Sequence, residues 1–284
     1  MQSLALDWQH AAVLTGALAA AAAGLSAARG ERVRRLAPVA REAAIIAGLY
    51  TLWQLAGRLS VLGTSGAFGR ARWIENAERT LHLPSEASVQ RVVTSNDVVA
   101  QAANIYYATM HFGALFVFLL WLFFRHRDQY RPVRRVLALT TFACLVIQLL
   151  PVAPPRLLPG YEDTAARYGQ SVYGLGFGED QLSAMPSVHV AWAVLVGWAV
   201  WRIGSGPWRW LGPAHAALTV LVVVATANHF WADGIVAVAV LALSWWACRA
   251  LERAWRAARR HHRDATPAAS DRPATPAPSR SAQP

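Results

Sequence analysis

The chain has 284 residues, of which 55% are hydrophobic and 13 are tryptophans, and its formal net charge at pH 7 is +11. Its apolar residues come in blocks close to the roughly 20 residues that a helix needs to cross a bilayer. This pattern argues against a soluble two-domain enzyme. The charge does not indicate nucleic acid, because all 27 basic residues are arginines and they cluster between the apolar blocks.

Several segments are predicted to span the membrane, because each is predominantly apolar and has few internal charges. They are residues 11–28, 43–62, 98–124, 136–152, 187–202, 211–228 and 233–250. The predicted fold class is therefore all-α: a polytopic membrane helix bundle with an extra N-terminal helix. If the first, alanine-rich segment does not span, six helices remain and the amino terminus changes side.

The chain divides into three predicted parts. Residues 1–42 form an N-terminal membrane segment with a basic connection, residues 43–250 form the membrane-embedded core, and residues 251–284 form a basic tail rich in proline and alanine. Such a tail is expected to be disordered. Inside the core, residues 66–95 have no run long enough to cross and are predicted to be interfacial helices that roof a lipid-facing cleft. Residues 153–186 predict an ordered loop.

The distribution of arginine predicts the orientation, because cytoplasmic loops collect positive charge. One set of connections is rich in arginine: Arg29, Arg32, Arg34, Arg35, Arg41, Arg125, Arg127, Arg131, Arg134, Arg135, Arg202, Arg209 and the tail. The opposite connections, 63–97, 153–186 and 229–232, balance arginine with aspartate and glutamate. We therefore expect a multi-pass protein of the cell membrane with a cytoplasmic carboxyl terminus.

Two short stretches carry chemistry-bearing side chains at the ends of apolar runs: Ala184-Met185-Pro186-Ser187-Val188-His189 and Asn228-His229-Phe230-Trp231-Ala232-Asp233. Ionisable residues are costly beside lipid, so their grouping at one membrane face indicates a functional site. The predicted topology places them on the extracytoplasmic side. Taken alone, either histidine is more simply explained as a structural hydrogen-bonding group.

The spacing of the second stretch predicts a nucleophile. Asp233 follows His229 by four residues, one helical turn, so its carboxylate can orient the imidazole and support the positive charge that develops. His189 is the predicted general acid and base, because an imidazole titrates near neutral pH. Together these groups suit transfer of a phosphoryl or phosphodiester group.

Three further residues are predicted to bind the substrate's phosphate. Ser187 begins a helix, where a hydroxyl and unpaired amides can bind an anion. Arg156 follows two prolines and offers forked donors that suit phosphate oxygens, while Asn228 precedes the predicted nucleophile. No metal and no cofactor is expected. The predicted partners are a membrane lipid and an acceptor that is water, a small alcohol or a second lipid; the oligomeric state stays open.

The two stretches, preceded by Pro154-Pro155-Arg156, resemble the type-2 phosphatidic acid phosphatase superfamily, and more closely its inositol phosphorylceramide synthase-like branch. The resemblance covers roughly residues 43–250. It implies a six-helix core, no metal, a phosphohistidine intermediate on His229, charge support from Asp233 and acid–base work by His189.

The chain departs from the superfamily's pattern in its cations. Phosphatases of the superfamily usually carry a lysine and an arginine in the first motif and an arginine six residues before the nucleophilic histidine. This chain has no lysine, and Val223 occupies the latter position. Fewer cations suit a phosphodiester, which carries one negative charge, better than a monoester, which carries up to two. We therefore expect phosphodiester headgroup or phosphoalcohol transfer.

Other functions remain open at this stage. Within the same enzyme class, the alternative is a lipid phosphate phosphatase acting on phosphatidic acid or a polyprenyl (pyro)phosphate. A haem protein would use His189 and His229 as axial ligands but leaves Asp233 unexplained. A transporter would use the same polar groups without chemistry. An intramembrane serine protease is disfavoured, because Ser187 lacks a nucleophile-elbow context.

Overall fold

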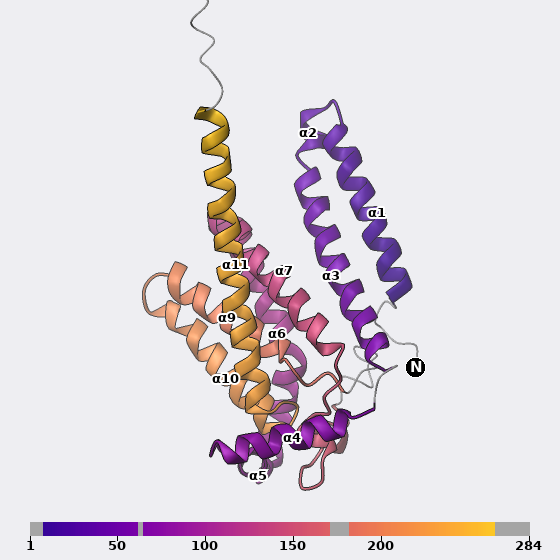
Figure 1. Cartoon of the computed structure of the whole chain (residues 1–284), viewed down its shortest axis with the longest axis vertical. Helices are drawn as coiled ribbons and strands as arrows, with labels where there is room; N and C mark the ends of the chain where they lie inside the picture. Colours follow the sequence, from indigo (N-terminus) through magenta and orange to yellow (C-terminus); the bar gives the residue numbers. More distant parts are fainter. Residues whose placement is uncertain (1–7, 62–64, 171–181, 265–284) are drawn as a thin grey trace, which may run out of the picture. The chain divides into compact units, whose positions relative to one another are not determined.

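The computed structural model describes residues 8–61, 65–170 and 182–264. The regular structure in these ranges is helical, with one isolated bridge between Val152 and Ser183. The helices are α1 (Trp8–Ala27), α2 (Glu31–Arg34), α3 (Ala37–Val61), α4 (Ala67–Thr80), α5 (Glu86–Thr94), α6 (Asp97–Arg125), α7 (Arg127–Gln148), η1 (Pro155–Leu157), α8 (Thr164–Arg167), α9 (Val188–Ile203), η3 (Pro207–Trp210), α10 (Leu211–Ala225) and α11 (Trp231–Asp264). The protein is an all-α membrane helix bundle (Figure 1).

Among the described residues, three helical stretches are long and apolar enough to cross a membrane: Trp8–Ala27, Pro207–Ala225 and Trp231–Arg259. A fourth is possible in α6, whose two halves meet at an angle of 41°. Helices also cover the other predicted spans, but α9 is shorter, and α7 begins in a charged stretch. The prediction of six or seven spans therefore stays a prediction.

Local sequence explains where the helices that carry the site begin. The Asn96 side chain accepts hydrogen bonds from the amides of Val98 and Val99 at the start of α6. Ser187 does the same for α9, accepting from the amide of Val190. Both residues are of types that satisfy the orphan amides of a helix start. Ser187 thus fixes the start of the helix whose first turn carries His189.

Two glycines let α9 and α10 approach unusually closely. A Cβ atom added to Gly212 would lie 2.5 Å from the carbonyl oxygen of Gly197, and one added to Gly197 would lie 2.8 Å from that of Gly212. Small residues at a contact between membrane helices allow such backbone approach.

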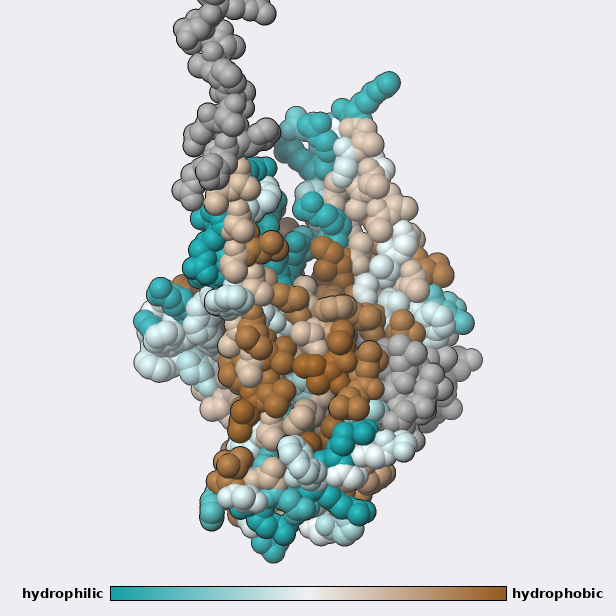
Figure 2. Space-filling view, in the orientation of Figure 1, coloured by the Kyte–Doolittle hydropathy of each residue, from teal (hydrophilic) through white to brown (hydrophobic). Residues whose placement is uncertain are grey.

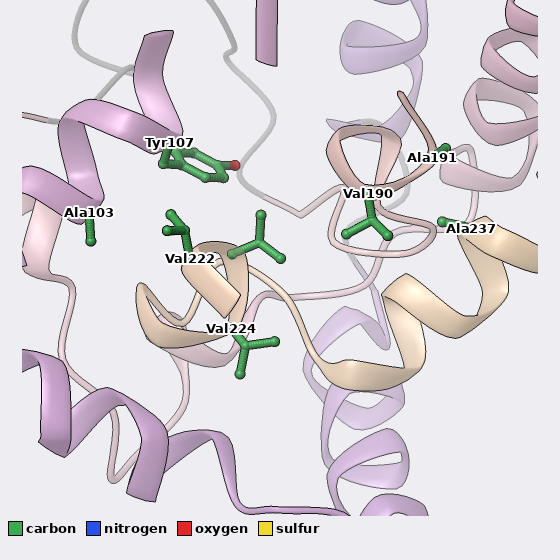
Figure 3. Close-up of a cluster of buried hydrophobic side chains, with 8 residues drawn as sticks. Ala103, Tyr107, Val190, Ala191, Val222, Val224 and Ala237 are labelled. Atoms are coloured by element: carbon green, nitrogen blue, oxygen red, sulfur yellow. The ribbon is translucent and has the colours of Figure 1, made fainter. Parts of the chain in front are cut away.

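Beside this contact, one cluster of buried side chains joins α6, α9, α10 and α11 (Figure 3). The cluster is made of Ala103, Tyr107, Val190, Ala191, Val222, Val223, Val224 and Ala237.

The interfacial stretch predicted at residues 66–95 forms two helices, α4 and α5. One face of α4 is buried through Ala67, Ala71, Ile74 and Glu78, which repeat at helical spacing. Ala71 and Ile74 pack against Phe230, which lies directly after His229 in the second histidine-containing stretch. Figure 2 shows hydrophobic side chains gathered over the middle of the visible face and hydrophilic ones toward α4. This segregation fits helices lying at a boundary between lipid and water.

The N-terminal helices form a hairpin in which α1 packs against α3. On α3, Glu42 accepts hydrogen bonds from Tyr130 and Arg134 of α7. These polar contacts join the hairpin to the rest of the bundle through a charged pair whose two side chains are 20% and 14% exposed.

The chain divides into two compact units at residues 245 and 246. In the second unit α11 continues to Asp264, so residues 251–264 of the predicted disordered tail are helical. The sequence explains this, because alanine, arginine and leucine favour helix and Arg256 lies four residues after Glu252, 4.0 Å from it. The rest of the predicted tail lies outside the described residues.

We predict that Gly212→Ala destabilises the protein by about 1–3 kcal/mol, because its Cβ meets backbone that cannot move aside as a side chain does. Thermal unfolding in detergent measures the effect. Gly113→Ala on α6 is the matched control, since a Cβ there meets nothing within 4 Å. Equal unfolding temperatures for the two variants would show that the close α9–α10 contact is not needed for stability.

Candidate active site

The loop from α10 to α11 presents the second histidine motif through a tight helix end. The amide of Ala227 donates to the carbonyl of Val224, and that of Asn228 reaches back to Val223. Many helices end with this pair of hydrogen bonds and with one residue in the left-handed backbone conformation just after the last helical turn. Here that residue is Ala227, at a φ of 51°. A residue with a Cβ is strained in this conformation, so packing around the loop must hold it.

Neighbouring bonds provide that support. Ala227 is fully buried, and its carbonyl accepts a hydrogen bond of 2.8 Å from the amide of Arg156. The amide of His229 donates to Val223, so the loop folds back over the end of α10 before the chain enters α11. The backbone of His229, from which the imidazole projects, is thereby held in place.

The side chain of His229 is held at one ring nitrogen. Nδ1 lies 2.8 Å from the carbonyl oxygen of Ala184 and 3.2 Å from Oδ2 of Asp233. A carbonyl oxygen only accepts, so Nδ1 carries the hydrogen and Nε2 carries the lone pair. The predicted pairing of His229 with Asp233 is therefore present. The Ala184 carbonyl, from the other motif, is a second orienting group that sequence reasoning missed.

The pKa of His229 supports a neutral imidazole. This residue lies between two candidate spans and is 5% exposed. Burial in the first place, and the positive charge of Arg156 in addition, lower its pKa to about 4, although the bond to Ala184 opposes the change. Charging the ring in a low-dielectric site is unfavourable. At neutral pH the lone pair on Nε2 is therefore not blocked by a proton.

His189 lies directly opposite that lone pair. Its Nδ1 is 3.3 Å from Nε2 of His229, and the ring centroids are 5.6 Å apart with an edge-on arrangement. The ring of Tyr107 packs against the other side of His189, with centroids 4.8 Å apart. The two predicted histidines are thus brought together from α9 and from the loop before α11. A phosphate that reaches Nε2 must replace this contact between the rings.

Asp233 makes more contacts than its sequence spacing predicted. Besides His229, its Oδ2 accepts a hydrogen bond of 2.9 Å from the amide of Phe230. Its backbone carbonyl accepts from the amide of Ser187, at 3.1 Å. Asp233 is fully buried, and so is Ser187. The start of α11 is therefore joined to the start of α9 at Asp233, the residue that orients the predicted nucleophile.

Arg156 and Asn228 form a second part of the site. Nη1 of Arg156 donates to Oδ1 of Asn228 at 3.2 Å, and Nε donates to Asp163, also at 3.2 Å. Arg156 is 5% exposed. A buried arginine held by a neutral amide and one carboxylate keeps much of its positive field near His229, as the lowered pKa of that histidine reflects.

Other side chains of types that could serve in such a site were weaker candidates in the sequence, and those that the structure describes lie apart from this arrangement. Arg167 pairs with Glu162 and Asp97 at the surface. His215 lies 2.8 Å from the hydroxyl of Tyr106, as expected for a structural histidine. Neither Cys144 nor Cys248 forms a disulfide. Tyr173 and the side chain of His111 lie outside the described part of the structure.

Two acidic residues that sequence reasoning did not single out adjoin the site. Glu78 of α4 accepts a hydrogen bond from the amide of Ala232, and Glu86 of α5 accepts one from the amide of Trp231. Each is at most 4% exposed. The signal for Glu78 was present in the sequence, since it continues the buried spacing of Ala71 and Ile74 along α4.

Comparison with known proteins gives one positive finding. The model of a family described as the PAP2 superfamily matches residues 72–247. No curated protein and no solved structure matches the chain. The matched range includes Arg156, His189, His229 and Asp233. The chain therefore belongs to the PAP2 superfamily, and is a lipid enzyme of the phosphatase and phosphotransferase type.

Proposed function

We propose that the protein transfers a phosphodiester headgroup or a phosphoalcohol between lipids through a phosphohistidine on His229. The observation that supports this most directly is the state of its imidazole. Nδ1 is held by Ala184 and Asp233, while Nε2 keeps its lone pair and faces a second histidine. A nucleophile oriented in this way by a carboxylate, next to a separate acid, follows the logic of a catalytic triad.

The proposed reaction has two displacements at phosphorus. In the first, Nε2 of His229 forms a bond to phosphorus while the bond to the leaving oxygen breaks, and a proton from His189 goes to that oxygen. In the second, His189 takes the proton of an acceptor hydroxyl, whose oxygen then displaces His229 from phosphorus. Asp233 stabilises the imidazole charge, whereas Arg156, with Asn228 and the start of α9 at Ser187, binds phosphate oxygens.

The preference for a diester rests on the surroundings of the phosphate. Val223, at the position where phosphatases of the superfamily carry an arginine, is 2% exposed and packs in the apolar cluster. Arg156 is the cation whose hydrogen bond to Asn228 brings it to the second motif. One arginine balances the single charge of a diester better than the two charges of a monoester. The closer likeness to the inositol phosphorylceramide synthase branch belongs to the same proposal.

Topology is the second element of the proposal. We infer an active site on the extracytoplasmic side and a cytoplasmic carboxyl terminus, because arginine gathers in the connections on the other side. Water, a small alcohol or another lipid then reaches the site from outside. The alternative acceptor, water alone, makes the protein a lipid phosphate phosphatase with the same first step.

The geometry gives less support to a haem protein. Nδ1 of His189 and Nε2 of His229 lie at hydrogen-bond distance from each other, 3.3 Å, so these nitrogens leave no room for a metal-bearing cofactor between them. A transporter catalyses no reaction, so for a transporter the substitution of His229 would change no product formation.

We predict that His229→Ala lowers transfer by about 10⁴-fold or more, because the variant lacks the attacking atom. His189→Ala is expected to lower it by about 10²–10⁴-fold, as loss of a general acid does. The measurement is product formation by purified protein in mixed micelles, together with acid-labile labelling by a donor carrying radioactive phosphate. The label should be absent from His229→Ala.

His82→Asn is the matched control. His82 is exposed, lies between α4 and α5, and has a positive φ of 57° that asparagine tolerates. It should retain native activity and labelling. Labelling of His229→Ala at the native level would refute the phosphohistidine, and native activity without any label would point to direct transfer to the acceptor.

We predict that a phospholipid diester yields acceptor-dependent product at least about tenfold faster than phosphatidic acid yields free phosphate, since the site holds fewer cations than a monoester requires. Mixed phospholipids with and without inositol, glycerol or ceramide provide the test. Faster phosphate release from the monoester, with no effect of any alcohol, would establish the phosphatase instead.

We also predict that a metal chelator leaves the rate unchanged, because a histidine nucleophile needs no metal-bound water. Among the described residues no group of three or more histidine, cysteine, aspartate or glutamate side chains has the geometry to hold a metal ion. The rate is compared before and after EDTA, with and without added Mg²⁺. A rate that falls with EDTA and returns with Mg²⁺ would contradict the proposed mechanism.

A further inference from the structure

Three consecutive amides at the start of α11 donate to three different carboxyl groups. The amide of Phe230 donates to Asp233 at 2.9 Å, that of Trp231 to Glu86 at 3.5 Å, and that of Ala232 to Glu78 at 2.6 Å. Acceptors are expected at a helix start, where amides lack partners and the helix dipole favours negative charge. Here two of the three acceptors come from other helices, α4 and α5.

Glu78 and Glu86 also face each other. They are 4% and 3% exposed, and Oε2 of Glu78 has no hydrogen-bond donor in the described structure, whereas Oε1 binds Ala232. Their Oε1 atoms accept from the amides of the consecutive residues Ala232 and Trp231, so the two carboxyl groups are held close together. Two buried carboxylates side by side cannot both ionise without a large penalty, so such pairs share one proton.

We propose that Glu78 and Glu86 are positioning residues that, as a pair sharing one proton, hold the first turn of α11 and with it His229 in the reactive orientation. The proposal rests on the function proposed for His229. Neither residue touches the reacting atoms; they act through the amides of Ala232 and Trp231, two or three positions after the nucleophile. The indole of Trp231 adds a bond of 2.7 Å to the carbonyl of Pro84, between the two helices that carry the pair.

The surroundings of Glu78 favour the protonated form of its carboxyl group, so the shared proton stays on Glu78. Burial, followed by Glu86 and then Asp233, raises the pKa of Glu78 to about 9. Tyr161 faces the pair from the loop before α8 and lies within hydrogen-bond distance of both Glu86 and Glu75. Burial raises the pKa of Tyr161 as well, so it remains a donor. On α4 itself, Arg79 pairs with Glu75, and His229 lies beyond Asp233.

The pair therefore makes activity and stability fall at alkaline pH. The folded protein keeps the Glu78 proton up to about pH 9, whereas an ordinary glutamate releases it near 4.5. Folding binds a proton between these values, so stability declines as pH rises through this window. Above pH 9 the second carboxylate charge repels Glu86 and Asp233 and loosens the turn that carries His229.

Two substitutions of Glu78 distinguish a role in positioning His229 from a role in general stability of the fold. Glu78→Gln keeps an acceptor for Ala232 and a donor for Glu86 but cannot ionise, so we expect neutral-pH activity within threefold of native and no decline near pH 9. Glu78→Ala removes the bond to the Ala232 amide and should lower kcat by about 10–100-fold, as small misplacements of a catalytic group do, with KM little changed. Glu162→Gln removes a half-exposed carboxylate that binds Arg167 and serves as the control.

The experiment measures pH profiles of kcat for these variants, phosphohistidine labelling, and hydrogen exchange of residues 228–236. Faster exchange in Glu78→Ala than in Glu78→Gln supports positioning independently of activity. Identical pH profiles and exchange for native protein and both Glu78 variants would overturn the proposal. If native protein gives no label on His229, the proposed function fails, whereas exchange still reports whether the pair holds the turn.

Discussion

The geometry of the candidate active site depends on one buried carboxylate, that of Asp233. Asp233 binds the ring of His229, the amide of Phe230 and, through its backbone carbonyl, the amide of Ser187. The same residue thus stabilises the first turn of α11, orients the predicted nucleophile and joins it to the helix that carries His189. The contacts of its side chain all fall on Oδ2, whereas Oδ1 is buried without a hydrogen-bond partner in the described structure, so the Phe230 amide and the His229 ring stabilise this desolvated carboxylate. Removing the Asp233 side chain would disturb the starts of α9 and α11 as well as the orientation of His229. The isosteric substitution Asp233→Asn is therefore needed to separate its effect on rate from its effect on structure.

The sequence was most informative where contacts are local. The i, i+4 pairing of His229 with Asp233, the helix start at Ser187 and the helical character of the apolar segments all follow from spacing and residue type, and the structure has them. Helix ends were less predictable: α11 runs past residue 250 because its sequence continues to favour helix. Membership in the PAP2 superfamily agrees with the motifs, whereas the assignment to one branch remains a proposal.

Contacts between distant segments could not be predicted in the same way. The Ala184 carbonyl that binds His229 belongs to the backbone, which no motif names. Glu78 lies 154 residues before its partner Ala232, and only the fold brings the two together. Its position on the buried face of α4 was visible in the sequence, but a buried glutamate needs a known partner before its purpose is clear. Sequence patterns therefore indicated which histidine to propose as the nucleophile, but not the distant groups that hold it.

The length of α9 has a consequence for where catalysis happens. With 16 residues the helix is about 24 Å long, less than the roughly 30 Å of a bilayer's hydrocarbon core. A helix of this length spans only where the bilayer thins or where its ends lie below the headgroups. His189, in the first turn of α9, then lies at the edge of the hydrocarbon core, at or below the level of the headgroups. For the function proposed above, the phosphate of a lipid donor would lie close to His189 without leaving its leaflet, whereas an acceptor from outside would have to pass the headgroup layer.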